Sequence, residues 1–188
     1  MTQVPVCVIT NGTLLTDPSV RRDLLDADAV MPSLDAAREE SFRAVCRAHP
    51  DLRVSSIIAG LAEFRREYTG KIWLEILLVA GLNDSPDDLA ALRDAADAIA
   101  PDAIQLNTVV RPPADRSIKP LTRGRMEEIR AFFGEKAEVI ASFGAHASEG
   151  KKVTADDALA SVKRHPGTTE EVAAALGADV GDVGNMLA

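Results

Sequence analysis

The sequence predicts an α/β protein built on a sheet of parallel strands, and three observations indicate this fold class. The apolar residues switch repeatedly between short β-branched runs, typical of strands, and the three- and four-residue spacing of helices. Strand and helix alternate five times up to residue 143, an order that favours parallel strands joined by right-handed crossovers. The 188 residues, 46% hydrophobic and 27% charged, are enough to bury a core. This order fits a barrel, a partial barrel or an open sheet.

The chain begins with a predicted strand, helix and strand. Val4–Thr10 is short and β-branched and ends at Asn11-Gly12, so we expect a buried strand followed by a turn. Asp17 and Pro18 then provide the N-cap and the first residue of a helix that runs to about Leu25. The second short strand, Ala27–Met31, stops at Pro32.

One longer helix is expected next, before the strongest strand of the chain. Its apolar face carries Ile57, Ile58, Leu61 and Phe64. Lys71–Val79 is the strongest predicted strand because it is almost wholly apolar. Ser85 and Pro86 start the following helix, again as N-cap and first helical residue. The apolar stripe of that helix is Leu89, Leu92, Ala96 and Ile99.

The pattern changes after the fifth strand. Ala103–Val109 is the fourth predicted strand, and a helix from about Thr122 precedes the fifth, Ala137–Ser142. We therefore expect residues 1–144 to form one α/β domain, residues 145–153 a linker, and residues 154–188 an all-helical appendage. The appendage has the spacing of a helix-turn-helix, as in a truncated winged helix.

The charge balance disfavours nucleic acids and anionic membranes as partners. Twenty-nine acidic residues against 21 basic ones give a net charge of −8, which repels phosphates. Residues 154–188 carry six acidic and two basic residues, so we expect this tail to bind no DNA and to suit a protein partner instead. No apolar run is long enough for a transmembrane helix and no signal-peptide pattern is visible, so we expect a cytoplasmic protein.

Polar residues follow the ends of the predicted strands, where parallel α/β sheets bind their ligands. These candidates are Asn11, Gly12, Ser33, Asp35, Gly81, Asn83, Asp84, Asn107 and Arg111. They suit hydrogen bonding to a ribose, a carboxylate or an adenine edge. Purely structural explanations stay open for several of them: a turn at 11–12, a capping loop at 33–35 and an N-cap cluster at 83–86. Glu75, in the middle of a strand, is either an inward-facing functional carboxylate or a surface acid.

Cysteine and histidine predict no metal site. The two cysteines, Cys7 and Cys46, cannot form a disulfide framework or a cysteine-rich metal cage. We expect Cys7 to be a small buried hydrophobic residue. The three histidines, His49, His146 and His165, are scattered through loop-like sequence.

The order of these short motifs resembles that of the radical S-adenosylmethionine enzymes. Thr10–Leu15 and Pro32–Ala36 are similar to the third and fourth strand ends of that family, and Leu78–Asp84 is similar to the fifth. Gln105–Thr108 together with Arg111-Pro112-Pro113 resembles the sixth. The resemblance covers about residues 4–143 and is closest to the iron–sulfur oxidoreductases similar to the tRNA wybutosine-synthesis group.

This resemblance implies a partial (β/α) barrel that holds S-adenosylmethionine and a [4Fe-4S] cluster, where reductive cleavage of the sulfonium produces a radical. It implies cofactor-binding roles for Asn11, Ser33, Asp35, Gly81 and Asn83. It implies substrate-facing roles for Glu75, Asn107 and Arg111. The substrate itself is not indicated.

Two features of the family are missing from the sequence. The cluster needs three thiolates from a Cys-x-x-x-Cys-x-x-Cys loop after the first strand, but the chain has only Cys7 and Cys46. The Gly-Gly-Glu-type motif after the second strand is also absent. We therefore expect a fragment that lacks the first two strands and the cluster loop, and whether this chain is itself an enzyme stays open.

Two other functions are compatible with the sequence. One is a noncatalytic regulatory or interaction protein that uses the acidic helical tail. The other is an enzyme of a different barrel or open-sheet family that binds a phosphorylated metabolite, although the chain has no P-loop and no Gly-x-Gly-x-x-Gly motif.

Overall fold

A computed structural model describes residues 4–110, 115, 117–141, 154–155, 168–169, 172–173 and 180–187. The chain divides into two compact units, Met1–Ala141 and Ser142–Ala188. We refer to them as the sheet unit and the C-terminal unit, and each is described by itself.

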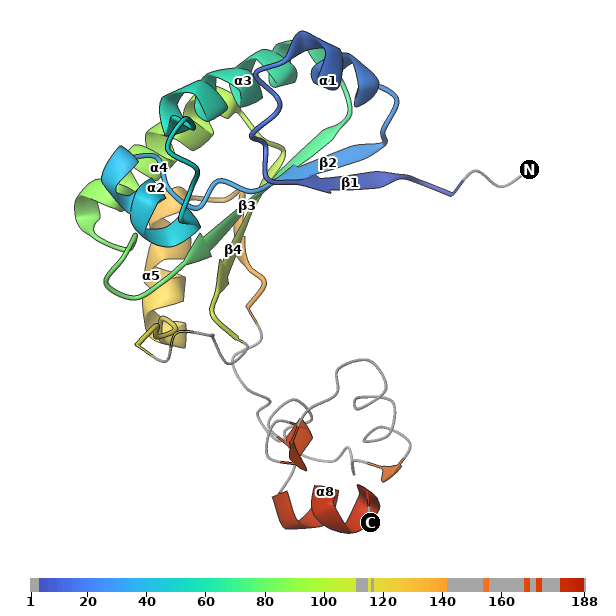
Figure 1. Ribbon diagram of the computed structural model, residues 1–188, viewed down its shortest axis with the longest axis vertical. Helices are drawn as coiled ribbons and strands as arrows, with labels where there is room; N and C mark the ends of the chain where they lie inside the picture. The colour runs from blue at the N-terminus through green and yellow to red at the C-terminus, as the bar shows by residue number, and fades with distance from the viewer. Residues whose placement is uncertain are drawn as a thin grey trace. The chain divides into compact units, whose positions relative to one another are not determined.

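The sheet unit is built on five parallel strands in the order of the chain, which confirms the predicted α/β class (Figure 1). The strands are β1 (Cys7–Thr10), β2 (Ala29–Pro32), β3 (Lys71–Leu78), β4 (Ala103–Thr108) and β5 (Ala137–Val139). Each strand pairs with the next one in the sequence, as expected when every connection is a crossover through a helix. All five carboxyl ends therefore lie at the same edge of the sheet.

The helices of this unit lie along one face of the sheet (Figure 1). They are α1 (Pro18–Asp23), α2 (Glu39–Cys46), α3 (Val54–Glu67), α4 (Pro86–Ile99) and α5 (Arg123–Phe133). The helix expected before β3, with Ile57, Ile58, Leu61 and Phe64 on one face, is α3, and α2 before it was not predicted. The chain leaves the helical path at Arg47, which adopts a left-handed conformation with φ of 47°, and Pro50 follows in the connecting segment.

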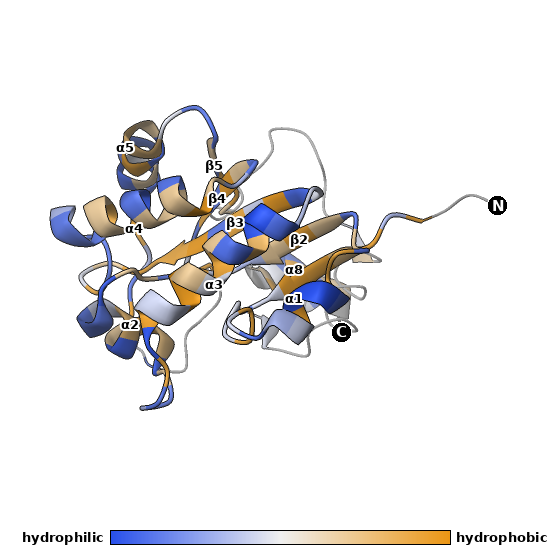
Figure 2. Cartoon of the chain, turned by 90° about the horizontal axis from the view of Figure 1, so that it is seen from above, coloured by the Kyte–Doolittle hydropathy of each residue, from blue (hydrophilic) through white to orange (hydrophobic). Residues whose placement is uncertain are grey.

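Alternation along β3 shows which face of the sheet is covered. Ile72, Leu74, Ile76 and Leu78 are fully buried, whereas Trp73, Glu75 and Leu77 keep part of their surface exposed. Because successive side chains point to opposite faces, the helices cover one face and leave the other open. When the chain is coloured by hydropathy, the strands are mainly apolar and the helices show both apolar and polar segments (Figure 2).

The prediction that the first strand is buried is wrong. β1 forms the edge of the sheet and pairs only with β2, so Val6 and Ile9 keep 56% and 72% of their surface exposed. Cys7 is exposed for the same reason and is not a buried hydrophobic residue. The opposite edge, β5, is short. The exposed residues Glu135 and Lys136 precede it, and the exposed Glu138 lies within it. The β5 edge thus has the charges that normally protect a sheet edge, and β1 does not.

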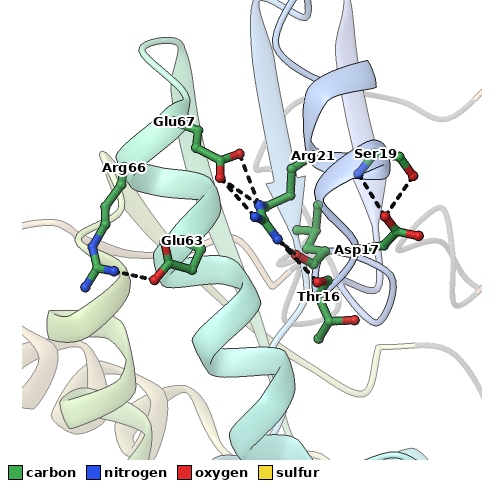
Figure 3. Close-up of polar contacts among 8 residues, drawn as sticks. Thr16, Asp17, Ser19, Arg21, Glu63, Arg66 and Glu67 are labelled. Carbon is green, nitrogen blue, oxygen red and sulfur yellow. Dashed lines mark hydrogen bonds and ion pairs between the residues drawn. The ribbon is translucent and has the colours of Figure 1, made fainter.

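Arg21 attaches the segment after β1 to α3 (Figure 3). Its Nε and Nη2 donate to the Glu67 carboxylate at 2.9–3.1 Å, and its Nη1 donates to the carbonyls of Leu15 and Thr16 at 3.0 and 3.3 Å. Gly60 of α3 approaches the same two residues, Leu15 and Thr16. A Cβ on Gly60 would lie 2.8 Å from backbone atoms of Leu15 and Thr16.

The close approach at Gly60 gives a test of this packing. Gly60→Ala should lower the free energy of unfolding by about 1–3 kcal/mol, because the new methyl group meets backbone that cannot move aside. Gly124→Ala is the matched control, since Gly124 is also helical and has no atom within 4 Å of the added Cβ. Gly124→Ala should raise the free energy of unfolding by about 0.5–1 kcal/mol, because alanine gives the unfolded chain a lower backbone entropy than glycine. Urea unfolding of both variants would measure the difference, and equal effects would contradict the packing.

The C-terminal unit is described only in part. α8 (Val180–Leu187) is a helix, and the buried residues Val172, Ala173 and Val183 form a small apolar cluster. The predicted linker, 145–153, and most of the predicted helix-turn-helix lie outside the described residues. In the part of the chain that the structure covers, no helix has the length and apolarity needed to cross a membrane.

Candidate functional site

A cavity of about 290 Å³ opens at the edge of the sheet formed by the carboxyl ends of β1 and β2. Three of the predicted cofactor-binding residues, Asn11, Ser33 and Asp35, line it together. The remaining lining residues are Thr13, Leu34, Phe42, Cys46, Ala48, Leu52 and Ile57. The cavity therefore has a polar side from the strand ends and a largely apolar wall from α2, α3 and the segment between them.

The segment after β2 continues along β3 and so fixes the polar side of the cavity. Ser33 forms an isolated parallel bridge with Glu75, and the amide of Leu34 donates to the carbonyl of Glu75 at 2.9 Å. One residue further, the Asp35 carboxylate accepts a hydrogen bond from the amide of Leu77 at 2.9 Å. Asp35 thus takes the place of a strand partner for β3, and its position is set by the backbone.

The side chain of Asn83 joins the segment after β2 to the end of β3 by hydrogen bonds. Its amide group donates to the carbonyls of Asp35 and Leu77 at 2.7 and 2.8 Å, and its side-chain oxygen accepts from the amide of Val79 at 2.7 Å. From the sequence we expected Asn83 to line the same cavity as Asn11. Its side chain is instead fully buried and is not among the lining residues. Its position is structural here, and a direct contact with a cofactor stays a prediction.

Gly81 lies apart from the cavity that Asn11, Ser33 and Asp35 share. It has a positive φ of 77°, and its amide donates to the Asp84 carboxylate at 2.7 Å, which gives Asp84 a role in the turn. Gly81 lines a second hollow of about 290 Å³ with Arg38, Ser41 and Asp88 among others. Gly81 does not line the first cavity, and its role in cofactor binding stays a prediction.

The predicted substrate-facing residues lie on the sheet. Glu75 alternates with buried neighbours on β3 and so lies on the face that the helices leave open. Asn107 of β4 is paired with Leu77, two residues beyond Glu75, and its side-chain amide donates to the Glu75 carboxylate at 3.4 Å. Arg111 lies outside the described residues. The substrate contacts themselves stay predictions.

Burial shapes the ionisation of the two titratable groups in the cavity. Desolvation raises the pKa of Asp35, the hydrogen bond from Leu77 lowers it, and the negative charge of Glu75 raises it further, with a net upward shift. Desolvation and the nearby Asp35 carboxylate raise the pKa of the Cys46 thiol to about 11. The charged form of Asp35 is therefore costly in this cavity unless a ligand donates hydrogen bonds to it.

The cysteines do not fit an iron–sulfur cluster. Cys7 lies on the edge strand and Cys46 at the end of α2, and the described residues contain no group of three or more His, Cys, Asp or Glu side chains that could hold a metal. A [4Fe-4S] cluster is normally held by several cysteine thiolates, and the sequence has only these two cysteines, on separate elements.

Several lining residues were not identified from the sequence. Phe42 and Cys46 are one helical turn apart on α2, a helix that the sequence pattern did not predict. Ile57 belongs to the predicted apolar face of a helix, a pattern that indicates packing and gives no sign of a ligand. Ala48 and Leu52 come from an irregular segment with no periodicity, so no sequence signal pointed to them.

Comparison with known proteins gives relatives of greater length than this chain. No family model matches it. It is 32% identical over its whole length to a protein of Brachyspira hyodysenteriae named GTPase Obg, of which it covers 28%. It is 27% identical over 87% of its length to a UPF0026 protein of Methanocaldococcus jannaschii, of which it covers 52%. It is 28% identical over 89% of its length to a UPF0026 protein of Helicobacter pylori, of which it covers 54%.

Two solved structures share the fold. A radical SAM methyltransferase from Sphaerobacter thermophilus aligns with 76% of this chain and 42% of its own, with a TM-score of 0.55 and 20% identity. A domain of a pyruvate-formate lyase-activating enzyme from Bacteroides vulgatus aligns with 72% of this chain and 81% of its own, with a TM-score of 0.55 and 14% identity. The chain thus has the α/β fold found in radical SAM enzymes.

The buried amide of Asn83 gives a first prediction for the site. Asn83→Ala should lower the free energy of unfolding by about 2–4 kcal/mol, because it leaves the buried amide of Val79 and the carbonyls of Asp35 and Leu77 without their partner. Asn11→Ala is the control, since Asn11 is exposed and should lose about 1 kcal/mol or less. Chemical unfolding would measure both, and an Asn83 effect no larger than the control would contradict the assigned role.

The Cys46 thiol gives a second prediction. The Cys7→Ser variant leaves Cys46 as the single thiol of the chain. A pKa of about 11 for Cys46, in place of 9.0, lowers its thiolate fraction at pH 8 by about 100-fold. The more basic thiolate is the better nucleophile, which recovers about a factor of 10. Alkylation by iodoacetamide should therefore be about 10-fold slower than that of N-acetylcysteine, and its rate should still rise between pH 9 and pH 10. A plateau below pH 9 would show that the thiol is not shifted.

Proposed function

We propose that this chain forms the nucleoside-binding part of a radical S-adenosylmethionine protein of the iron–sulfur oxidoreductase type, similar to the wybutosine-synthesis group. The observation that carries the proposal is the shared cavity of Asn11, Ser33 and Asp35 at the carboxyl edge of the sheet. The fold of this sheet is that of radical SAM enzymes. Parallel α/β sheets bind their ligands at this edge.

The residues of the cavity suit the nucleoside half of S-adenosylmethionine. In the proposal, the Asp35 carboxylate accepts hydrogen bonds from ribose hydroxyls and Ser33 contributes its hydroxyl beside it. The Asn11 amide faces the same space, and the apolar side chains of Phe42 and Ile57 bury the base. Ribose hydroxyls that donate to Asp35 also lower the free-energy cost of its buried charge.

The proposal assigns the cluster ligands to residues outside these 188. Two observations support that assignment. The chain spans about half the length of the UPF0026 proteins it matches. The β1 edge exposes Val4, Val6 and Ile9 and is free to pair with a further strand, as a sheet lacking its first two strands would be. We assign no cleavage step to the chain itself.

The remaining expectations belong to the same proposal. Glu75 and Asn107, on the open face of the sheet, and Arg111 are proposed to face the substrate. A cytoplasmic location is part of the proposal. The net charge of −8 argues against nucleic acids and anionic membranes as partners, and the acidic tail is proposed to bind a protein. We do not propose GTP hydrolysis from the name of one relative, because the sequence has no Gly-Lys-Ser or Gly-Lys-Thr of a P-loop.

Binding of S-adenosylmethionine is the direct test of the cavity. By equilibrium dialysis, Asp35→Asn should weaken binding about 10-fold or more and Ser33→Ala about 3- to 10-fold, as expected for hydrogen bonds with and without a charged acceptor. Asp94→Asn and Ser55→Ala replace exposed residues of the same types on α4 and α3 and should bind as the wild type does. Wild-type affinity in both cavity variants would contradict the proposal.

Anaerobic iron–sulfur reconstitution tests the assignment of the cluster. The 188-residue chain should retain no iron after gel filtration and should form no 5′-deoxyadenosine from S-adenosylmethionine under reducing conditions. The full-length UPF0026 protein of Methanocaldococcus jannaschii, treated in parallel, should do both. Cleavage by the 188-residue chain would overturn the fragment assignment. A relative that holds no cluster, together with a chain that binds no nucleotide, would favour the noncatalytic interaction protein.

A further inference from the structure

The outer wall of the cavity is formed by a segment without regular secondary structure. Residues 47–53 connect α2 to α3, and Ala48 and Leu52 within them line the cavity. Such a segment would be expected to have many conformations, and ordering it on binding would weaken the affinity for any ligand. The hydrogen bonds of Arg43 order residues 47–53 before any ligand binds.

Arg43 gathers the carbonyl groups of this segment around one guanidinium. Its Nη1 donates to the carbonyls of Ala48 and His49 at 3.1 and 2.6 Å. Its Nη2 donates to the carbonyl of Pro50 at 3.2 Å and also to that of Leu52. Four of the carbonyls between residues 48 and 52 therefore accept from one side chain of α2. Arg53 also donates to two of them, those of Pro50 and Leu52, at 2.6 and 3.1 Å, so Arg43 is the side chain that joins these carbonyls to α2.

Glu39, one helical turn before Arg43, holds the far end of the segment. Its carboxylate accepts a hydrogen bond from the amide of Val54, the first residue of α3, at 2.8 Å. The N-cap residue of α3, Arg53, makes no capping hydrogen bond with its own side chain, so Glu39 supplies that cap. The second carboxylate oxygen of Glu39 lies 3.6 Å from Nη2 of Arg43. Both ends of the segment are thus tied to one turn of α2.

The chemistry of this arrangement requires arginine. A guanidinium presents five donors in a fixed plane, whereas a lysine ammonium has three donors at one point and cannot reach carbonyls spread over five residues. Arg43 is also partly exposed, with 33% of its side-chain surface accessible, and the carbonyls it leaves can bind water. Its replacement should therefore loosen the segment without unfolding the sheet.

We propose that Arg43, supported by Glu39, is the positioning residue of the cavity. It holds residues 47–53 in one conformation, so that Ala48 and Leu52 present a preformed apolar wall to the ligand. The identity of that ligand as S-adenosylmethionine rests on the proposed function, whereas the ordering of the wall does not.

Arg43→Lys tests the proposal, with Arg66→Lys as its matched control. Arg66 is an exposed arginine of α3 that pairs with Glu63 and has no contact with the segment. Trypsin cleaves after Arg47 and Arg53, at the two ends of the segment, and mass spectrometry gives the rate at each bond. Both rates should rise about 10-fold in Arg43→Lys and stay unchanged in Arg66→Lys, with similar melting temperatures for the two variants.

Binding of S-adenosylmethionine separates this proposal from the proposed function. Arg43→Lys should bind about 10-fold more weakly than the wild type, and Arg66→Lys equally well. If the wild type binds but cleavage or affinity is unchanged in Arg43→Lys, the positioning role is overturned. If the wild type does not bind, the proposed function fails and the cleavage rates alone decide whether Arg43 orders the wall. Should Arg43→Lys melt far below its control, Glu39→Gln replaces it, since that change removes the ion pair and retains an acceptor for Val54.

Discussion

The hydrogen bonds between the ends of β2 and β3 are the constraint on which the rest of the site depends. Asn83 joins Asp35 to Leu77 through their carbonyls, and Asp35 accepts from the amide of Leu77. The chain after β2 is thereby kept against β3 for several residues beyond the last regular pairing. Without this connection Ser33 and Asp35 would lie on a free loop. With it, they are held at one edge of the sheet beside Asn11.

Contacts made by α1, α2 and α3 also fix the chain segments next to this edge of the sheet. Arg21 and Gly60 bring the segment after β1 close to α3, and Arg43 and Glu39 tie the segment between α2 and α3 to α2. In each case a side chain or a close contact fixes backbone that has no regular partner. Every buried side-chain polar atom within the described residues has a hydrogen-bond partner. The cavity is consequently preformed, which reduces the entropy lost when a ligand binds.

The same sheet is incompletely covered elsewhere. The face opposite the helices carries Trp73, Glu75 and Leu77 with part of their surface accessible, and the β1 edge is apolar and uncharged. Exposed apolar edges favour association with another strand. The ordered cavity and the partly uncovered sheet are both consistent with our proposal that other residues provide the cluster-binding part.

The alternation of the five strands with helices α1, α3, α4 and α5 can be predicted from the sequence, because the change between two-residue and 3.6-residue periodicity depends only on neighbouring side chains. Parallel pairing followed from that order, and with it the meeting of Asn11, Ser33 and Asp35 at one edge. The exposed edge position of β1 is visible only in the folded sheet, since the same β-branched run suits a buried or an edge position. The tertiary structure also decided that Asn83 is buried and that Ala48 and Leu52 line the cavity. Those positions depend on hydrogen bonds and contacts between residues far apart in the chain, which no local pattern records.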